Sequence, residues 1–337
     1  MKVKIFKNKN FISDITLNII ASGLMATTLQ FIVYPLLNKE TSAEIFGEIL
    51  FMMSIVNITA VLLGNSLNNV RLIFEKEYQE SNIKGDFLSI LVIAGAINFF
   101  VITIVALLFW NNKPIVGNLL LIIVSILTML RAYLTVEYRL KLNYKKIFQH
   151  SLIYSFSFSL STLLLIITDL WQIVFFSGEL ISFIFLVRTT SLLKEPFKIT
   201  IKFKKTIKQY FLLSTSSLIG NVLNYLDRLI IFPFLGPHKV AVFFTATLVG
   251  KLSSFIVSPI SGVLLSYISN KKGRMTLSLF WKINIGILIF SSITTIFTSF
   301  FYLINKLHNF NFFTIFWNSI HFSPSSNNFP LWKVTAN

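Results

Sequence analysis

The sequence contains no cysteine and has few charged residues. Without cysteine, the chain cannot form disulfides, use a thiolate nucleophile or bind a metal through sulfur. Charged residues make up 13% of the chain, whereas roughly 25% is typical of soluble domains. Hydrophobic residues make up 54%. This balance excludes an ordinary soluble domain and favours a protein embedded in a membrane.

Sequence signals for catalysis are also missing. No GxxxxGK[ST] loop is present, so nothing indicates a nucleotide-hydrolysing engine. No loop is large enough for a soluble catalytic domain, and no loop carries a convincing set of catalytic carboxylates. The few histidines are scattered, with none at metal-ligand spacing: His150, His238, His308 and His321. We therefore expect no enzyme activity, no cofactor and no bound metal.

Apolar runs of about 20 residues recur along the chain, the length that an α-helix needs to cross a bilayer. The first run contains Asp14 and Asn18 and is not followed by a cleavage site, so we interpret it as an uncleaved helix rather than a signal peptide. The sequence predicts an all-α polytopic membrane protein with about nine transmembrane helices. Their approximate positions are 12–37, 45–67, 87–109, 115–136, 150–168, 171–188, 210–231, 240–268 and 279–304.

Lysine and arginine are divided unevenly between the alternate loops. One side holds 21 of them, whereas the other holds only four, Lys39, Lys113, Lys239 and Lys306. Because basic residues concentrate in cytoplasmic loops, this asymmetry places the N-terminus in the cytoplasm. The net charge of +17 would suggest nucleic acid in a soluble protein. Here most of it lies in short loops between spans, and no nucleic-acid partner is expected.

The longest loop is basic and separates two groups of spans. We expect four parts: a first lobe of six helices at 1–188, a cytoplasmic connector at 189–209, part of a second lobe with three helices at 210–304, and an irregular tail at 305–337.

An internal repeat supports two lobes. When the chain is shifted by 198 residues, the first hairpin aligns with spans seven and eight without a gap, and Pro35 matches Pro233 while Gly64 matches Gly262. Both copies start in the cytoplasm, so the repeat is parallel, as in many two-lobed transporters. The alternative is that two similar hairpins arose from shared composition.

Three basic residues fall within predicted spans: Arg131, Arg228 and Lys251. A cation in hydrocarbon costs several kcal/mol unless it faces protein or a water-filled cavity. A membrane cavity lined with cations suggests an anionic passenger. Arg131 lies near the cytoplasmic end of its span, so it could instead anchor that helix at the interface.

A polar stripe on span seven ends at Arg228. Steps of three and four residues place five side chains on one helical face: Ser214, Ser217, Asn221, Asn224 and Arg228. Such a face must meet protein or water rather than lipid. Asn221 and Asn224 could line a cavity beside Arg228, or could supply hydrogen bonds between helices. Arg228 could also snorkel to the outer interface or pair with Asp227.

Lys251 lies about 11 residues into span eight, near the middle of the bilayer. Because a close-packing series of small residues runs beside it, we predict that its side chain points into the bundle. Glu179, near the middle of span six, is the candidate partner for an ion pair. Glu179, Asp227 and Asp14 are therefore the candidates for ion pairing or for coupling to a transported ion.

Three segments carry a resemblance to a known family. They are the basic N-terminus with its first span, YRLKLNYKK at 138–146, and residues 224–268 with an Asp-Arg pair, a Leu-Gly turn and then span eight. Together they resemble bacterial polysaccharide repeat-unit flippases of the multidrug/oligosaccharidyl-lipid/polysaccharide exporter superfamily. The resemblance covers roughly residues 5–300 and depends on the order and topology of the spans.

The resemblance implies two helical lobes, alternating access and a position in the cytoplasmic membrane of a bacterium. It also implies that a cationic cavity receives the diphosphate of an undecaprenyl-linked oligosaccharide. Carried over by position, Arg228 and Lys251 would line that cavity from the second lobe, with Arg131 as a weaker candidate. The expected partners are the lipid-linked oligosaccharide, membrane lipids, a polysaccharide polymerase and chain-length machinery.

The family's members have more spans than the nine predicted here, so we expect the second lobe to be incomplete. This leaves an inactive truncated remnant as one alternative. A multidrug or cation antiporter of the same superfamily is another, although a site for cations should favour carboxylates over Arg228 and Lys251. A membrane-bound polymerase or acyltransferase is a third, disfavoured because no large external loop or paired catalytic residues are present.

Overall fold

The structure is a computed structural model that describes residues 9–83, 85–110, 114–168 and 170–251, together with 263, 285, 289 and 292. For residues 9–12, 246 and 248–251 it describes the backbone alone. The chain divides into two compact units, Met1–Thr276 and Leu277–Asn337, and the helices named next belong to the first. The predicted ninth span, most of the eighth and the predicted tail lie outside the described residues.

Every regular element in these residues is a helix, most of them α-helical, with two π segments (η2 and η3) and two 3₁₀ turns (η4 and η5). Their order is α1 (Lys9–Thr27), η2 (Thr28–Val33), α2 (Tyr34–Glu40), α3 (Ala43–Val56), η3 (Asn57–Val61), α4 (Leu62–Glu80), α5 (Asp86–Trp110), α6 (Ile115–Leu134), α7 (Val136–Leu140), α8 (Tyr144–Ser161), η4 (Thr162–Ile166), α9 (Gln172–Thr189), η5 (Leu192–Lys194) and α10 (Phe203–Lys251).

Six helical segments in the described residues are long and apolar enough to cross a membrane, which confirms the predicted class of an all-α membrane protein. They are Ser13–Glu40, Ala43–Glu80, Asp86–Trp110, Ile115–Leu140, Gln172–Thr189 and Phe203–Thr245. Helix α8, in the predicted span 150–168, is not among them, since two lysines, a glutamine, a histidine and several serines lower its hydropathy. It nevertheless packs along α9 and α1. The count of nine spans and the two-lobed fold stay predictions.

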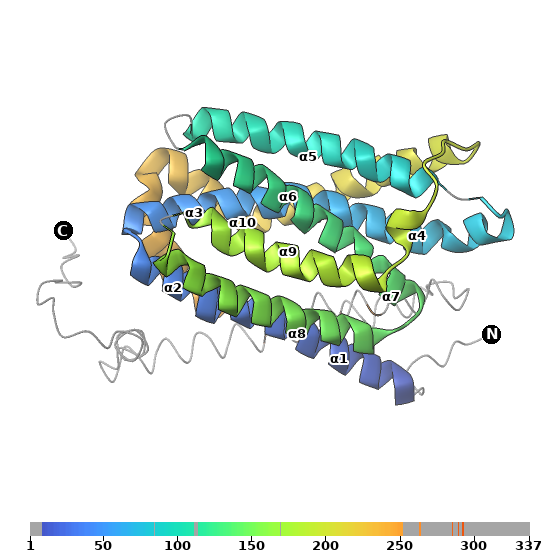
Figure 1. Cartoon of the computed structure of the whole chain (residues 1–337), viewed down its shortest axis with the longest axis horizontal. Helices are drawn as coiled ribbons and strands as arrows, with labels where there is room; N and C mark the ends of the chain where they lie inside the picture. Colours follow the sequence, from blue (N-terminus) through green and yellow to red (C-terminus); the bar gives the residue numbers. More distant parts are fainter. Residues whose placement is uncertain are drawn as a thin grey trace, which may run out of the picture. The chain divides into compact units, whose positions relative to one another are not determined.

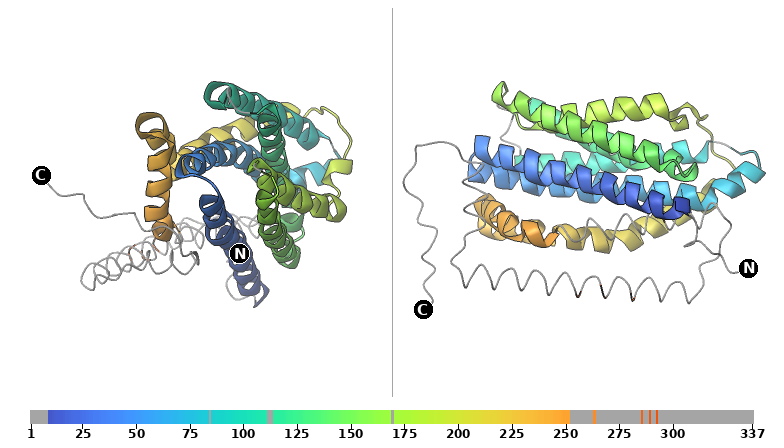
Figure 2. Two further views of the ribbon diagram at one scale, coloured as in Figure 1. Left: turned by 60° about the vertical axis from the view of Figure 1, so that its left-hand side comes forward. Right: turned by 90° about the horizontal axis from the view of Figure 1, so that it is seen from below.

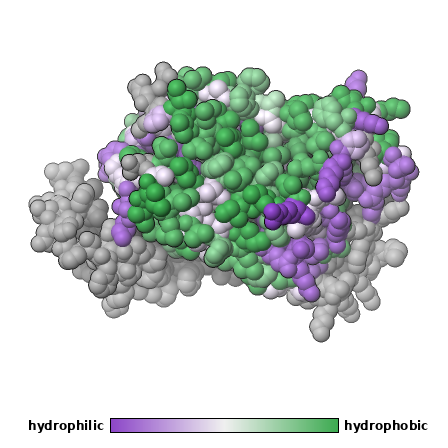
Figure 3. Space-filling view, viewed as in Figure 1, coloured by the Kyte–Doolittle hydropathy of each residue, from purple (hydrophilic) through white to green (hydrophobic). Residues whose placement is uncertain are grey.

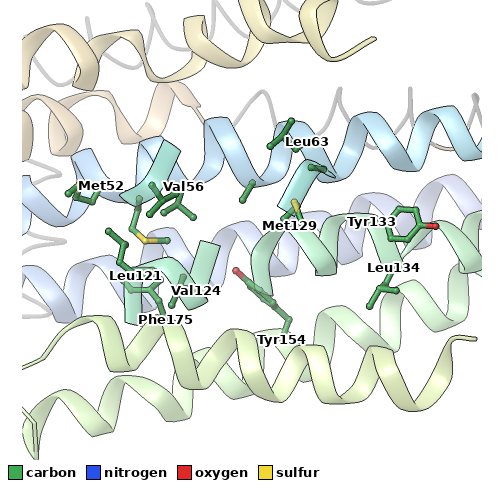
Figure 4. Packing of buried hydrophobic residues seen from close by; sticks show 14 of the residues in the cluster. Met52, Val56, Leu63, Leu121, Val124, Met129, Tyr133, Leu134, Tyr154 and Phe175 are labelled. Carbon is green, nitrogen blue, oxygen red and sulfur yellow. The ribbon is translucent and has the colours of Figure 1, made fainter. Parts of the chain in front are cut away.

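The helices of the first unit run side by side, with α9 between α6 and α8, as Figures 1 and 2 show. Hydrophobic side chains cover most of the face drawn in Figure 3, while hydrophilic ones gather toward the end where α4 and α7 lie. Inside, most of the helices contribute to one apolar core, and Figure 4 shows part of it: Met52 and Val56 from α3, Leu121 and Val124 from α6, Tyr154 from α8, and Phe175 from α9.

Helix α10 bends where a turn was predicted between spans seven and eight. Gly236 has φ 81° and ψ 169°, a conformation outside the helical region that glycine adopts readily, and it lies between Pro233 and Pro237. Both parts of α10 pack against α3. Before the bend, Phe232 stacks on Phe51 with ring centroids 3.9 Å apart.

After the bend, the backbone of α10 touches α3 at Gly47. A Cβ atom added to Gly47 would lie 1.8 Å from the carbonyl oxygen of Pro237, so only glycine fits there. Further on, the rings of Phe244 and Phe46 meet edge to face with centroids 6.0 Å apart. The close approach of α10 to α3 fixes the position of Arg228.

Candidate functional site

A cavity of about 300 Å³ lies within the bundle and receives side chains from α1, η2, α2, α3, η3, α6, α8 and α9. Its apolar wall includes Met25, Met53 and Phe175. The polar groups that line it are Ser22, Tyr34, Asn57, Thr128, Arg131, Tyr154 and Glu179. A cavity of this size with a few polar groups among apolar side chains is the usual form of a ligand or ion site.

Arg131 and Glu179 form a two-pronged ion pair in the wall of this cavity. The Arg131 guanidinium donates from Nε to Glu179 Oε2 at 2.8 Å and from Nη2 to Oε1 at 3.0 Å. Both side chains are largely buried, with 15% and 4% exposed. Arg131 therefore lines a cavity and pairs with Glu179 inside the bundle.

This pair differs from the prediction, which named Lys251 as the candidate partner of Glu179. Helices α6 and α9 lie side by side, so Arg131 and Glu179 face one another across that contact. Lys251 is the last residue of α10, and its side chain lies outside the described residues. The sequence could not show the pairing, because it depends on which helices are neighbours.

The pair makes the cavity polar but leaves no net charge from these two groups. The ring of Tyr154 adds a cation–π contact, with its centroid 4.9 Å from the Arg131 Cζ. Removing one member of a buried ion pair leaves an uncompensated charge, which costs about 3–5 kcal/mol. In this arrangement Glu179 occupies two of the Arg131 donors that an anion would need.

Two π segments meet the same cavity. Leu29 lies in η2, while Asn57 and Val61 lie in η3, and all three line the cavity wall. A π segment inserts one extra residue into a helix and is common at functional sites. At the start of η3, Asn57 Nδ2 donates at 2.7 Å to the carbonyl oxygen of Met53, which also accepts from the Asn57 backbone N–H.

Arg228 lies between α10 and α3 and is only 4% exposed. Its Nη1 donates to Ser54 Oγ at 3.1 Å and to the carbonyl oxygen of Leu50 at 3.4 Å. The Nε atom has no hydrogen-bond partner within the part of the chain that the structure describes. Because the guanidinium points into α3, the interpretation of Arg228 as a snorkelling residue is wrong.

Aromatic rings surround the Arg228 guanidinium and connect it to the cavity. Its Cζ lies 4.8 Å from the ring centroid of Phe244 and 5.5 Å from that of Tyr225. Tyr34 packs edge to face on Phe244, with centroids 5.4 Å apart, and its hydroxyl interacts electrostatically with Arg228. Because Tyr34 also lines the cavity, this one side chain lies between the two arginine sites.

The predicted polar stripe of span seven is only partly buried. Ser214 and Arg228 face the bundle, Ser217 and Asn221 are half-buried, and Asn224 is exposed. Asn221 Nδ2 donates to the carbonyl oxygen of Ser217 at 2.8 Å, a contact within α10 itself. The first and last residues of the stripe are therefore buried in the bundle, whereas those between them are more exposed.

The two remaining carboxylate candidates lie elsewhere. Asp14 and Asp227 are half-buried, and neither is among the residues that line the cavity. Residues that sequence reasoning missed are Tyr34 and Tyr154. Each lies in an apolar run, and only a knowledge of neighbouring helices would have distinguished them from other polar residues in the spans.

Comparison with family models, with curated proteins and with solved structures gives no match.

Proposed function

We propose that this chain translocates an undecaprenyl-diphosphate-linked oligosaccharide unit across the cytoplasmic membrane for the synthesis of surface polysaccharide. The observation that carries the proposal is the environment of Arg228. Its two hydrogen bonds to α3 have neutral acceptors, and its buried Nε has no hydrogen-bond partner among the described residues. Arginine presents a planar set of donors that matches phosphate oxygens, so donors remain for a diphosphate.

In this proposal the lipid tail stays in the bilayer while the diphosphate meets Arg228 beside α3. Ser54 would release the guanidinium without being left unsatisfied, because its hydroxyl also donates to the carbonyl oxygen of Leu50 at 2.6 Å. Ser54 and the Leu50 carbonyl oxygen remain within reach of the guanidinium when the anion leaves. Arg228 would therefore bind an anion and then release it. Alternating access of two lobes would carry the cargo across.

The pair of Arg131 and Glu179 suggests how transport could be coupled to an ion. If Arg131 turned toward an anionic group, Glu179 would remain as a buried carboxylate without its cation. A charge left in this way is costly, so Glu179 would take up a proton or a metal cation. Anion binding in the cavity would then bring a positive charge with it.

A cation antiporter of the same superfamily is the second candidate, and the buried carboxylate of Glu179 is the observation that favours it. The two candidates differ in which residue they need. A flippase for a diphosphate depends on the charge of Arg228, whereas an antiporter depends on Glu179 and tolerates the loss of Arg228.

The test is export of polymer in a strain that lacks its own flippase. We expect Arg228→Ala to abolish export and Arg228→Lys to restore it in part, while both variants insert into the membrane at normal levels. Lys239→Ala is the matched control, because Lys239 is an exposed cation on the same helix. Normal export by Arg228→Ala would overturn the proposed role of this arginine.

A further inference from the structure

The connector between α9 and α10 is bound along its backbone to the ends of α4 and α5. Asp86 Oδ1 accepts a hydrogen bond from the Thr200 backbone N–H at 2.7 Å, and Ser89 Oγ donates to the carbonyl oxygen of Lys198 at 3.1 Å. Further back, Arg71 Nη1 donates to Glu195 Oε2 at 2.9 Å. These contacts, spaced along 195–200, hold this part of the connector in a fixed path.

Gly85 allows the connector to approach this closely. It has φ 122°, which favours glycine, and a Cβ atom there would lie 2.8 Å from the carbonyl oxygen of Pro196. Lys202 adds a contact at the far end, since its Nζ donates to the carbonyl oxygen of Glu77 at 2.8 Å. Glu195, the backbone of 196–200 and Lys202 thus hold segment 195–202, which we call the strap, against α4 and α5.

The outer side of the strap is apolar and exposed. Phe197 and Ile199 lie on either side of the exposed Lys198 in the extended part of the strap, and Ile201 follows in the turn that precedes α10. The three apolar side chains are 62%, 69% and 98% exposed. A bound, extended segment that presents three large apolar side chains forms a ready-made contact surface.

The contacts of the strap place it at the predicted boundary of the membrane. Arg71 lies four residues after the predicted span 45–67, and Asp86 lies immediately before the predicted span 87–109. Exposed lysines flank the apolar side chains in the sequence: Lys194, Lys198, Lys204 and Lys208, and Lys205, which pairs with Glu77. Apolar side chains flanked by lysines at this depth match the boundary between acyl chains and anionic headgroups.

We propose that the strap is an interfacial anchor, in which Phe197, Ile199 and Ile201 insert into the cytoplasmic leaflet and the neighbouring lysines bind anionic phospholipid headgroups. The inference is independent of the cargo. Because the strap is already fixed by Arg71, Asp86 and Gly85, insertion requires little further ordering of the chain. The anchor would hold the start of α10 at a fixed depth in the membrane, relative to the helices that precede the strap.

The test uses the absence of native cysteine. The full chain with Ile199→Cys carries an environment-sensitive fluorophore and is reconstituted in phosphatidylcholine vesicles with and without phosphatidylglycerol. We expect quenching by lipid-attached nitroxide to be strong and quenching by aqueous iodide to be several-fold weaker than at a control position. Glu80→Cys is that control, since Glu80 ends α4, whose tip projects beyond the start of α5 (Figure 1).

A second measurement tests the lysines. Replacement of Lys194, Lys198 and Lys204 by glutamine should reduce the enrichment of spin-labelled phosphatidylglycerol around the protein, whereas Lys145→Gln, an exposed lysine at the start of α8, should not. Iodide quenching at position 199 equal to that at position 80 would overturn the proposal. So would shielding of position 199 in native membranes but not in purified vesicles, because that result would indicate a protein partner.

Discussion

Arg131 and Arg228 are both buried arginines in a helical membrane protein, yet they are compensated in opposite ways. Arg131 meets a carboxylate across α6 and α9 through two hydrogen bonds. Arg228 donates to a serine hydroxyl and to a backbone carbonyl oxygen of α3. The first arrangement neutralises a charge, while the second leaves the guanidinium able to accept an anionic partner. A buried cation therefore indicates function only when its partners are known.

The largest expected effect comes from breaking the ion pair between Arg131 and Glu179. Glu179→Gln removes the charge that compensates Arg131 and should lower the free energy of unfolding by about 3–5 kcal/mol. The measurement is unfolding of the purified protein in mixed detergent micelles by increasing sodium dodecyl sulfate. The double variant Arg131→Met with Glu179→Leu removes both charges and should recover much of the loss. A double variant as unstable as Glu179→Gln would contradict ion pairing as the cause.

A smaller effect is expected from a substitution that moves Arg228 away from α3. Gly47→Ala places a Cβ atom against the Pro237 carbonyl oxygen, which forces α10 away from α3 at a cost of about 1–3 kcal/mol. Polymer export should also fall, because Arg228 loses its position. The matched controls are Gly23→Ala and Gly220→Ala, since a Cβ atom at either meets nothing within 4 Å. Equal losses in all three variants would show that helix packing at Gly47 is not special.

Removal of the second arginine should separate stability from activity. Arg228→Met keeps the length of the side chain and loses hydrogen bonds to neutral acceptors, which contribute about 1.5–3 kcal/mol when the donor is charged. We expect its unfolding free energy to fall less than that of Glu179→Gln, while export falls to background. If Arg228→Met proves the less stable of the two, the guanidinium has a structural role like that of Arg131.

The smallest effect is expected at the acceptor on α3. Ser54→Ala removes one partner of Arg228 and should cost about 0.5–1.5 kcal/mol in the unfolding assay. In combination with Arg228→Met, it should add little, since the contact is already gone. Full additivity of the two losses in a double-mutant cycle would show that Ser54 stabilises α3 by itself rather than through Arg228.

Composition and hydropathy were sufficient to predict the helical membrane class, because each span must satisfy its own backbone hydrogen bonds in lipid. The positions of Arg131 and Arg228 within spans were equally visible. Their partners were not, since Glu179 and Ser54 become neighbours only through the packing of α9 on α6 and of α3 on α10. The span 150–168 stays a prediction, because α8 carries several serines and a histidine and is not among the six apolar segments.

The apolar outer side of the strap could have been predicted from the sequence. Phe197, Ile199 and Ile201 alternate with polar residues, the pattern of an extended segment with two unlike sides. The inward contacts could not have been predicted, because nothing local to Gly85 or Asp86 identifies the distant segment that they bind. The role of a turn or loop residue therefore depends on which distant segment packs against it.

The π segments also control rotational phase. Each extra residue in an α-helix advances the chain by about 100° around the axis, so η2 sets the angle at which α2 leaves α1. If η2 relaxed to α-helical geometry, α2 would turn about its axis, and Tyr34 would leave its position between the cavity and Arg228. A change in the phase of one helix would thereby uncouple the two arginine sites without any hinge between them.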